Sequence, residues 1–176
     1  DDCIYVPGSF TTGCDFDPSS GTNSISTENG DTFLSKFYAD GTYYWTRTWG
    51  AGDGSIHIRD IVIGDNEELY ISGQFNHTVD FDPTHYNTEE LTAVWASDIF
   101  ISRYNTNLLF EWVRGFGGDS SDSSMYTDVD KFGTVYIPGW YEGTIDLNPD
   151  PAVSDLHTSN GNQDSFVNKI LADGGW

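Results

Sequence analysis

The same short phrases recur along the chain at a spacing of about 66 residues, and this repetition constrains the fold more than any other sequence feature. The tetrapeptide DFDP begins at Asp15 and at Asp80, and a less acidic copy, DLNP, begins at Asp146. The flanking phrases also repeat in one order: IYVPGSF (4–10), LYISGQF (69–75) and VYIPGWY (135–141); DTFLSKF (31–37), DIFISRY (98–104) and DSFVNKI (164–170); WTRTWG (45–50) and WVRGFG (112–117); IVIGDNEELY (61–70) and TDVDKFGTVY (127–136). Such order predicts tandem copies of one structural unit.

Each recurring phrase reads as a short β-strand. The phrases are rich in β-branched and aromatic residues, are separated by Gly, Asp, Asn and Pro, and show no helical period. One full unit holds four such strands, over 61–65, 69–81, 98–104 and 110–116. The sequence therefore predicts an all-β fold of tandem four-stranded antiparallel β-propeller-like blades, incomplete, with about 2.5 repeats of about 66 residues. We expect a single domain over 1–176, with units at approximately 1–60, 61–126 and 127–176.

The repeated text resembles a known family. The phrases YISGQFNHTVDFDP, DIFISRYN and FEWVRGFGGDSSD look like the bacterial extracellular β-propeller repeats often labelled SBBP-type, and the resemblance covers nearly the whole chain. It implies a propeller-like architecture and a place in a large secreted or surface protein. It implies no particular activity.

The number of units is too small for a closed propeller. If the strands of a unit are called A to D, the chain reads B-C-D, A-B-C-D, A-B-C, whereas single-chain propellers hold about four to eight blades. We therefore expect either a piece of a longer protein or self-association with further copies or further repeats. Head-to-tail contacts would then produce a fibre if they stay open, or a ring if they close.

Composition restricts the partners and the location. Lys and Arg total 7 against 28 Asp and Glu, a formal net charge of −21, which disfavours nucleic acid and anionic membranes. No apolar run approaches the roughly 20 residues that span a bilayer, so no membrane insertion is expected. An extracellular location, secreted or on the cell surface, fits the two cysteines.

The cysteines, Cys3 and Cys14, lie close together in the sequence. They are predicted to form a disulfide, either with each other through a turn at Pro7-Gly8 or with a neighbouring molecule. Two buried free thiols are the alternative.

The repeated acidic phrase admits two interpretations. Calcium is the one cofactor suggested, because Ca²⁺ takes 6–8 oxygen ligands and Asp-rich loops can supply them. The candidate ligands are Asp15, Asp17, Asp80, Asp82, Asp146 and Asn148. In the other interpretation the first Asp caps a turn and the second accepts hydrogen bonds from backbone N–H groups.

Five of the seven basic residues occupy repeated positions. Lys36, Arg103 and Lys169 share one place, and Arg47 and Arg114 share another. In so acidic a chain we expect them to have fixed carboxylate partners, with the repeated Asp residues as natural candidates.

The function predicted from these observations is structural. The four histidines lack zinc spacing, neither a G-x-S-x-G motif nor a Walker loop is present, and the prominent acids recur in every unit, so the protein is not expected to be an enzyme. We expect a non-catalytic secreted or cell-surface structural protein, plausibly a self-assembling subunit of a fibre or other repeat assembly. The alternative is a carbohydrate-binding, lectin-like module that uses Trp95 and Trp140.

Overall fold

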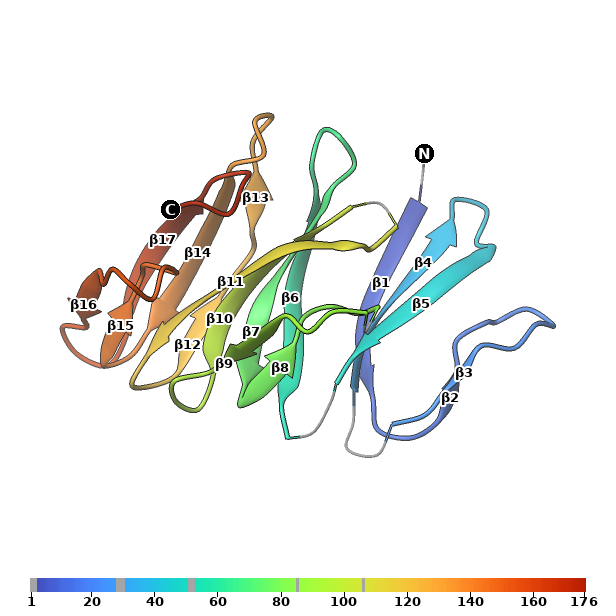
Figure 1. The fold of residues 1–176 in the computed structure, drawn as a ribbon, viewed down its shortest axis with the longest axis horizontal. Helices are drawn as coiled ribbons and strands as arrows, with labels where there is room; N and C mark the ends of the chain where they lie inside the picture. The colour runs from blue at the N-terminus through green and yellow to red at the C-terminus, as the bar shows by residue number, and fades with distance from the viewer. Residues whose placement is uncertain (1–2, 28–30, 51–52, 85, 106) are drawn as a thin grey trace.

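The computed structural model describes residues 3–27, 31–50, 53–84, 86–105 and 107–176. Within these residues the chain forms seventeen β-strands and no helix (Figure 1). The strands build several antiparallel sheets, so the expectation of an all-β protein is confirmed. No helix that could cross a bilayer occurs in the described part of the chain.

The central sheet contains one complete set of four strands. Its order is β6 (Ser55–Ile63), β7 (Leu69–Asn76), β10 (Asp98–Tyr104) and β11 (Phe110–Gly118), and each neighbouring pair is antiparallel. At its outer edge, β11 pairs through Gly117 and Gly118 with β15 (Thr144–Asp146), which pairs in turn with β16 (Leu156–Thr158).

Two smaller sheets flank the central one. The N-terminal sheet has the order β1 (Cys3–Phe10), β4 (Asp31–Tyr38) and β5 (Tyr43–Trp49). In the C-terminal sheet, β14 (Val135–Tyr141) pairs on one side with β12 (Asp122–Ser124) and β13 (Asp128–Val129), and on the other with β17 (Asp164–Ile170). Two further hairpins join β2 (Cys14–Asp15) to β3 (Ser24–Ile25) and β8 (Thr78–Asp80) to β9 (Glu90–Thr92).

In each of the three sheets, a glycine of one repeated phrase lies opposite a phenylalanine of the phrase on the neighbouring strand. The pairs are Gly8 with Phe33, Gly73 with Phe100 and Gly139 with Phe166. A Cβ at each glycine would fall 2.6, 3.0 and 2.4 Å from the facing ring, so the absence of a side chain makes room for the ring. Covering a strand glycine with an aromatic ring in this way pins the register of the two strands.

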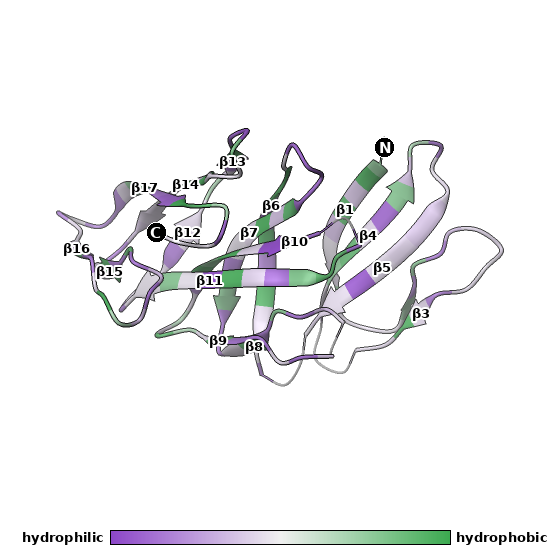
Figure 2. Cartoon of the chain, turned by 45° about the horizontal axis from the view of Figure 1, so that its top comes forward, coloured by the Kyte–Doolittle hydropathy of each residue, from purple (hydrophilic) through white to green (hydrophobic). Residues whose placement is uncertain are grey.

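The sheets pack face to face and enclose two hydrophobic cores. One lies between the N-terminal and central sheets and includes Leu34, Trp49, Leu69 and Phe100. The other lies between the central and C-terminal sheets and includes residues such as Ile101 and Phe166. Along strands such as β6 and β11, hydrophobic positions alternate with hydrophilic ones (Figure 2). The central sheet is therefore covered on both faces, which explains why β7 is buried along nearly its whole length.

The structure leaves both cysteines as free thiols. Cys3 is half-buried at the start of β1 and Cys14 is exposed at the start of β2. Because β1 runs as one strand from Cys3 to Phe10, no turn forms at Pro7-Gly8, and the bond within the chain that the sequence suggested is not formed. A bond between two molecules stays a prediction.

Candidate functional site

The first aspartate of each acidic phrase holds a hairpin loop together. Asp80 Oδ1 accepts hydrogen bonds from the N–H groups of Asp82 (3.0 Å) and Glu89 (2.9 Å), on the two sides of the loop that joins β8 to β9. Asp15 makes the same two bonds to Asp17 and Asn23, and Asp146 makes them to Asn148 and Asp155. Burial raises the pKa of Asp146, but the N–H groups of Asp155 and Asn148 outweigh it and leave the pKa below its ordinary value.

The second acidic position of the phrase also serves the backbone. Oδ1 of Asp17, Asp82 and Asn148 accepts the N–H of Ser19, Thr84 and Asp150, each at 2.9 Å. The amide oxygen of Asn148 accepts this hydrogen bond as a carboxylate oxygen does, which explains why Asn can replace Asp in the third copy of the phrase. In the described residues no three acidic, His or Cys side chains gather where they could hold a metal ion. The hydrogen bonds agree with the interpretation of the phrase as a turn stabiliser, and calcium binding stays a prediction.

Replacing Asp80 separates these two interpretations. Asp80→Ala removes an acceptor from two backbone N–H groups and is expected to lower the free energy of unfolding by about 2 kcal/mol. Asp80→Asn keeps the Oδ1 acceptor, so its loss of unfolding free energy is expected to be less than half of the loss in Asp80→Ala. Urea unfolding measures both losses. Equal losses in the two variants, with wild-type stability that rises on adding Ca²⁺, would favour a metal site instead.

The repeated basic residues have partners other than the repeated aspartates. Arg103 contacts Glu68 at 2.8 Å and Glu111 at 3.1 Å. Arg47 and Arg114 each lie 5.8 Å from the ring centre of the tryptophan two residues earlier, and each donates to a backbone carbonyl. The expected pairing with the DFDP carboxylates is therefore replaced, at these three residues, by cation–π contacts and other acids.

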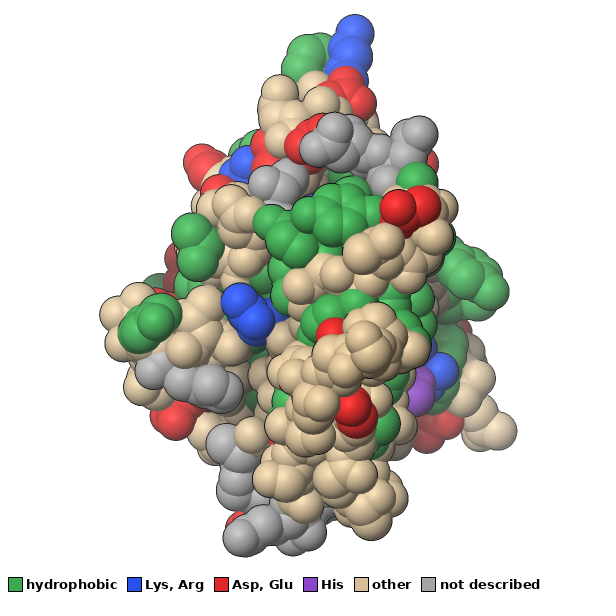
Figure 3. All heavy atoms as spheres, turned by 90° about the vertical axis from the view of Figure 1, so that its right-hand side faces the viewer, with side chains coloured by type: hydrophobic (Ala, Val, Ile, Leu, Met, Phe, Trp, Pro, Cys, Tyr) green, Lys and Arg blue, Asp and Glu red, His purple; other side chains and the backbone are tan. Residues whose placement is uncertain are grey.

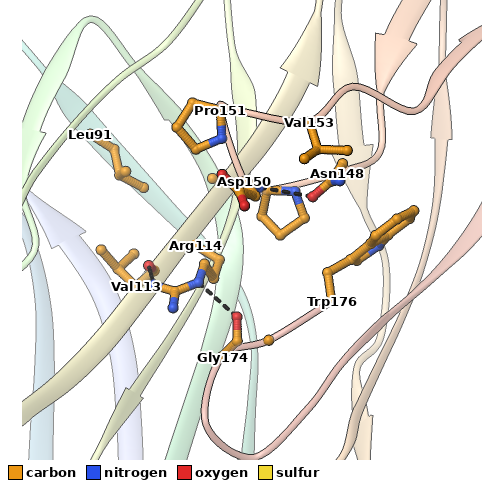
Figure 4. Close-up of a pocket in the computed structure, with 12 residues that line it drawn as sticks. Leu91, Val113, Arg114, Asn148, Asp150, Pro151, Val153, Gly174 and Trp176 are labelled. Atoms are coloured by element: carbon orange, nitrogen blue, oxygen red, sulfur yellow. Dashed lines mark hydrogen bonds between the residues drawn. The ribbon is translucent and has the colours of Figure 1, made fainter.

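A groove lies between the central and C-terminal sheets (Figure 4). It measures about 690 Å³ and is bounded by β11, the loop after β15 and the turn after β17. Arg114 and Trp176 stand on opposite sides of it, with Asn148 and Asp150 between them. The guanidinium is fixed, because Nε donates to the Gly174 carbonyl at 2.7 Å and Nη1 to that of Val113 at 2.7 Å. Sequence reasoning singled out neither Trp176 nor Arg114 as lining a site.

The two tryptophans proposed for carbohydrate lie on different elements. Trp95 is 66% exposed in the loop between β9 and β10. Trp140, on β14, lines a hollow of about 320 Å³ with Arg59, Met125 and Tyr126. Trp95 is not among the residues that line this hollow.

Two carboxyl groups are buried where the central sheet meets the C-terminal sheet. Asp98 begins β10 and is 3% exposed, and Asp122 begins β12 and is 0% exposed. Asp98 Oδ2 accepts the N–H of Val94 at 2.9 Å, but Asp98 Oδ1 and both Asp122 carboxylate oxygens make no hydrogen bond of normal length and angle. The Asp98 carboxyl rests on Gly117, where a Cβ would fall 2.4 Å from it.

Burial changes the protonation of this pair. Desolvation is the main cause that raises the pKa of Asp122 to about 7, and the negative charge of Asp98 adds to it. The N–H groups of Gly118 and Glu142 partly offset this effect, and the Asp119 carboxylate reinforces it. Desolvation also raises the pKa of Asp98. Asp122 was not recognisable from the repeat, because the corresponding position in the central sheet, which faces Phe75 as Asp122 faces Tyr141, is Ile56.

Comparison with known proteins adds no relative: neither the protein-family models nor the curated proteins contain a match to this chain.

Proposed function

We propose that this chain is a non-catalytic structural protein of the cell exterior, whose propeller-like blades stack on further copies of the chain. The extracellular location rests on the resemblance to SBBP-type repeats. The observation that carries the proposal is that, in the described residues, each of the two outer sheets presents an exposed face of the kind that is buried between the sheets.

The outer face of the N-terminal sheet is apolar. The pairing of Ile4 with Phe37 and of Gly8 with Phe33 places their side chains on one face, together with Val6. Ile4 is 48% exposed and Val6 is 40% exposed. Hydrophobic side chains gather near the middle of this end of the molecule (Figure 3). A patch of this kind on an end sheet is typical of an interaction surface.

The central sheet shows what covers such a face. Its residues at the corresponding positions of the repeated phrases include Leu69, Ile71 and Phe100, and all three are at most 1% exposed. They pack on Leu34 and Trp49 of the N-terminal sheet. The same kind of surface is thus buried in one sheet and open in the other.

The outer face of the C-terminal sheet is the counterpart. Tyr136 pairs with Lys169 and Pro138 pairs with Val167, which places these four side chains on one face. Tyr136 is 38% exposed and Val167 is 67% exposed. The corresponding residues of the central sheet, Tyr70 and Ile101, are buried against the next sheet.

The two open faces therefore carry residues at the same repeat positions as the residues that pack against each other between the sheets. Seating the N-terminal face of one copy on the C-terminal face of another would continue the stack head to tail, and such a contact produces an open fibre or a closed ring. The net charge of −21 opposes this association at low salt, and added salt screens the repulsion.

Charged substitutions on the two faces test the proposal. The wild-type protein is expected to show a particle mass above that of one chain that grows with concentration and salt, as measured by sedimentation and light scattering. Val6→Asp and Val167→Asp should each abolish growth, because an uncompensated charge would be buried in the contact. An equimolar mixture of the two variants should stop at dimers, since each variant keeps one intact face.

Phe132→Asp is the matched control. Phe132 is 73% exposed in the turn between β13 and β14, outside the strands that form the two faces, and its replacement should leave association unchanged. A wild-type protein that stays a single chain at every concentration and salt level would overturn the proposal.

Carbohydrate binding is the second candidate function. The hollow beside Trp140 favours it, because Tyr126 at its rim is 79% exposed and aromatic rings stack on sugar faces. Reproducible glycan-array binding that is lost in Trp140→Ala or Trp95→Ala would favour this candidate over the structural one.

A further inference from the structure

The carboxyl pair, Asp98 and Asp122, lies at the interface between two sheets. Asp98 begins β10 of the central sheet, and Asp122 begins β12 of the C-terminal sheet. Ser97 and Ser121, the residues directly before them, form a parallel β-bridge. This bridge sets the two acids side by side, and the negative charge of Asp98 raises the pKa of Asp122. The carboxyl pair therefore spans the interface and is buried while the two sheets stay packed together.

Hydrophobic packing and hydrogen bonds hold this interface closed. The second hydrophobic core lies between the two sheets. Gln74 Nε2 donates to the Asp122 backbone carbonyl at 2.6 Å, and the N–H of Thr127 donates to Asp60 Oδ2 at 2.7 Å. The carboxyl pair opposes these contacts when it is charged, because a charge that is removed from water costs free energy.

The matching interface between the N-terminal and central sheets has only one of the two acids. Asp31 begins β4 as Asp98 begins β10, but the residue that corresponds to Asp122 is Ile56, which is 7% exposed. An isoleucine stabilises such a position by its burial, whereas a buried carboxyl without hydrogen bonds of normal geometry costs free energy. The second acid is thus a departure from the repeat that lowers stability, and departures of this kind are expected at functional positions.

A further acidic group adds to the negative charge around the pair. The Asp119 carboxylate, in the loop between β11 and β12, raises the pKa of Asp122 further. Glu142, in the loop between β14 and β15, contributes its backbone N–H, as Gly118 does at the end of β11. These two N–H groups stabilise the charged form, but they do not outweigh burial.

The basic groups of the neighbouring strands do not neutralise the pair. In the part of the chain that the structure describes, no ion pair joins either carboxyl to a basic side chain. β12 and β14 contain no Lys, Arg or His, and His57 of β6 is exposed. Other basic groups have other bonding partners: Arg59 of β6, Arg103 of β10, Arg114 of β11 and His77 after β7. A second negative charge in the pair would therefore stand without a cation beside it.

Access of water changes the protonation of the pair. While the interface is closed, desolvation raises the pKa of both Asp98 and Asp122, to about 7 for Asp122 against an ordinary value of 3.8. When the interface opens, water solvates both carboxyls and the pKa of each returns toward the ordinary value. Between pH 4 and pH 7 the open form has lost a proton that the closed form keeps, so a rise in pH favours opening.

We infer that Asp98 and Asp122 form a pH-dependent switch between the central and C-terminal sheets, closed while the pair holds a proton and opened locally when both carboxyls are ionised. The interface between the N-terminal and central sheets, with Ile56 at the matching position, lacks this switch. The inference goes beyond the proposed function and does not depend on stacking, because both acids belong to one chain.

Amide hydrogen exchange locates the opening. The Val6→Asp variant, which is expected to stay a single chain, is measured with EDTA at pH 5 and pH 8, and each rate is corrected for intrinsic exchange at that pH. We expect the protection of the β14 amides to fall by roughly tenfold or more, because the pKa difference of about three units increases the population of the open form. The β4 amides, which also lie on an inner strand, should change by less than about threefold.

Two substitutions in the same background identify the group that titrates. Asp122→Asn removes the carboxyl and should reduce the fall in β14 protection to about threefold or less. Asp128→Asn, which removes an exposed carboxylate of β13, should leave that fall unchanged. The inference is overturned by constant protection of β14, by equal falls in β4 and β14, which indicate global unfolding, or by an undiminished fall in Asp122→Asn. Sedimentation of the wild-type protein tests the proposed function separately.

Discussion

Asp122→Asn is expected to raise the free energy of unfolding at pH 8 and to remove most of its fall between pH 4 and pH 7. In the wild-type protein the buried Asp122 carboxyl has a pKa of about 7, against 3.8 for an ordinary aspartate. Between these two values the unfolded chain has lost the proton and the folded chain still holds it. The folded state therefore binds more protons, and its stability decreases as the pH rises.

The size of the effect follows from the pKa difference. A shift of about three pKa units corresponds to about 4 kcal/mol that the wild-type protein loses as the pH rises from 4 to 7. Asparagine has nearly the same shape and carries no charge, so it avoids this loss. Urea unfolding of both proteins at pH 5 and pH 8 measures it, and we expect the variant to be more stable by about 2–4 kcal/mol at pH 8.

Asp128→Asn is the control for this experiment. Asp128 is exposed, and in the described part of the chain its carboxyl accepts the N–H of its neighbour Val129, so Asp128→Asn removes an exposed carboxylate for comparison with the buried one. Equal pH dependence in the wild type and in Asp122→Asn would contradict the prediction. If Ca²⁺ at pH 8 raises the free energy of unfolding of the wild-type protein but not that of Asp122→Asn, Asp98 and Asp122 hold a cation rather than a proton.

Phe81→Ala is expected to cost about 3–5 kcal/mol of unfolding free energy, whereas Phe16→Ala should cost about 1 kcal/mol. Both residues are the phenylalanine of a DFDP phrase. Phe81 is 0% exposed, packs on Phe75 and Phe100, and its carbonyl accepts hydrogen bonds from Trp49 Nε1 and the Tyr104 hydroxyl. Phe16 contacts its neighbouring rings but is only half-buried, because no further sheet covers it in the described chain.

This pair of variants isolates the effect of sheet position, since the phrase and the substitution are identical. Thermal and urea unfolding of the two variants under conditions that keep the protein as a single chain measure the difference. Similar losses would mean that the two ends of the chain are covered alike. If stacking is induced by salt, the loss in Phe16→Ala should grow, because the proposed contact covers the face that includes Phe33 beside it.

Local rules were sufficient to predict the main strands and to offer backbone hydrogen bonding as one of two interpretations of the acidic phrase, although the strand expected over 69–81 is divided into β7 and β8. Alternating β-branched and aromatic residues mark β7, β10 and β14 because a strand exposes its two faces in turn. The turn geometry of DFDP depends on atoms within nine residues of Asp80, so the sequence alone suggested hydrogen bonds to the backbone. The interpretation as propeller blades, and with it the function, goes beyond those rules and remains our proposal.

Contacts between residues far apart in the chain were not predictable in this way. The partners of Arg103 are Glu68 and Glu111, because strand register rather than repetition decides which acid faces a basic side chain. The sequence likewise left a bond between Cys3 and Cys14 as one of its alternatives, whereas β1 runs unbroken from Cys3 and both thiols are free in the structure.

The repeated phrases by themselves determined which segments become strands and where the chain turns, because hydrogen bonding and side-chain alternation act over a few residues. Only the tertiary structure decided which copy of each phrase is buried. Stacking covers Phe81 and leaves Phe16 half-exposed, and it encloses Asp122 at a position where the central sheet has an isoleucine. Burial is a property of what lies on the other side of a sheet, and no single phrase contains that information.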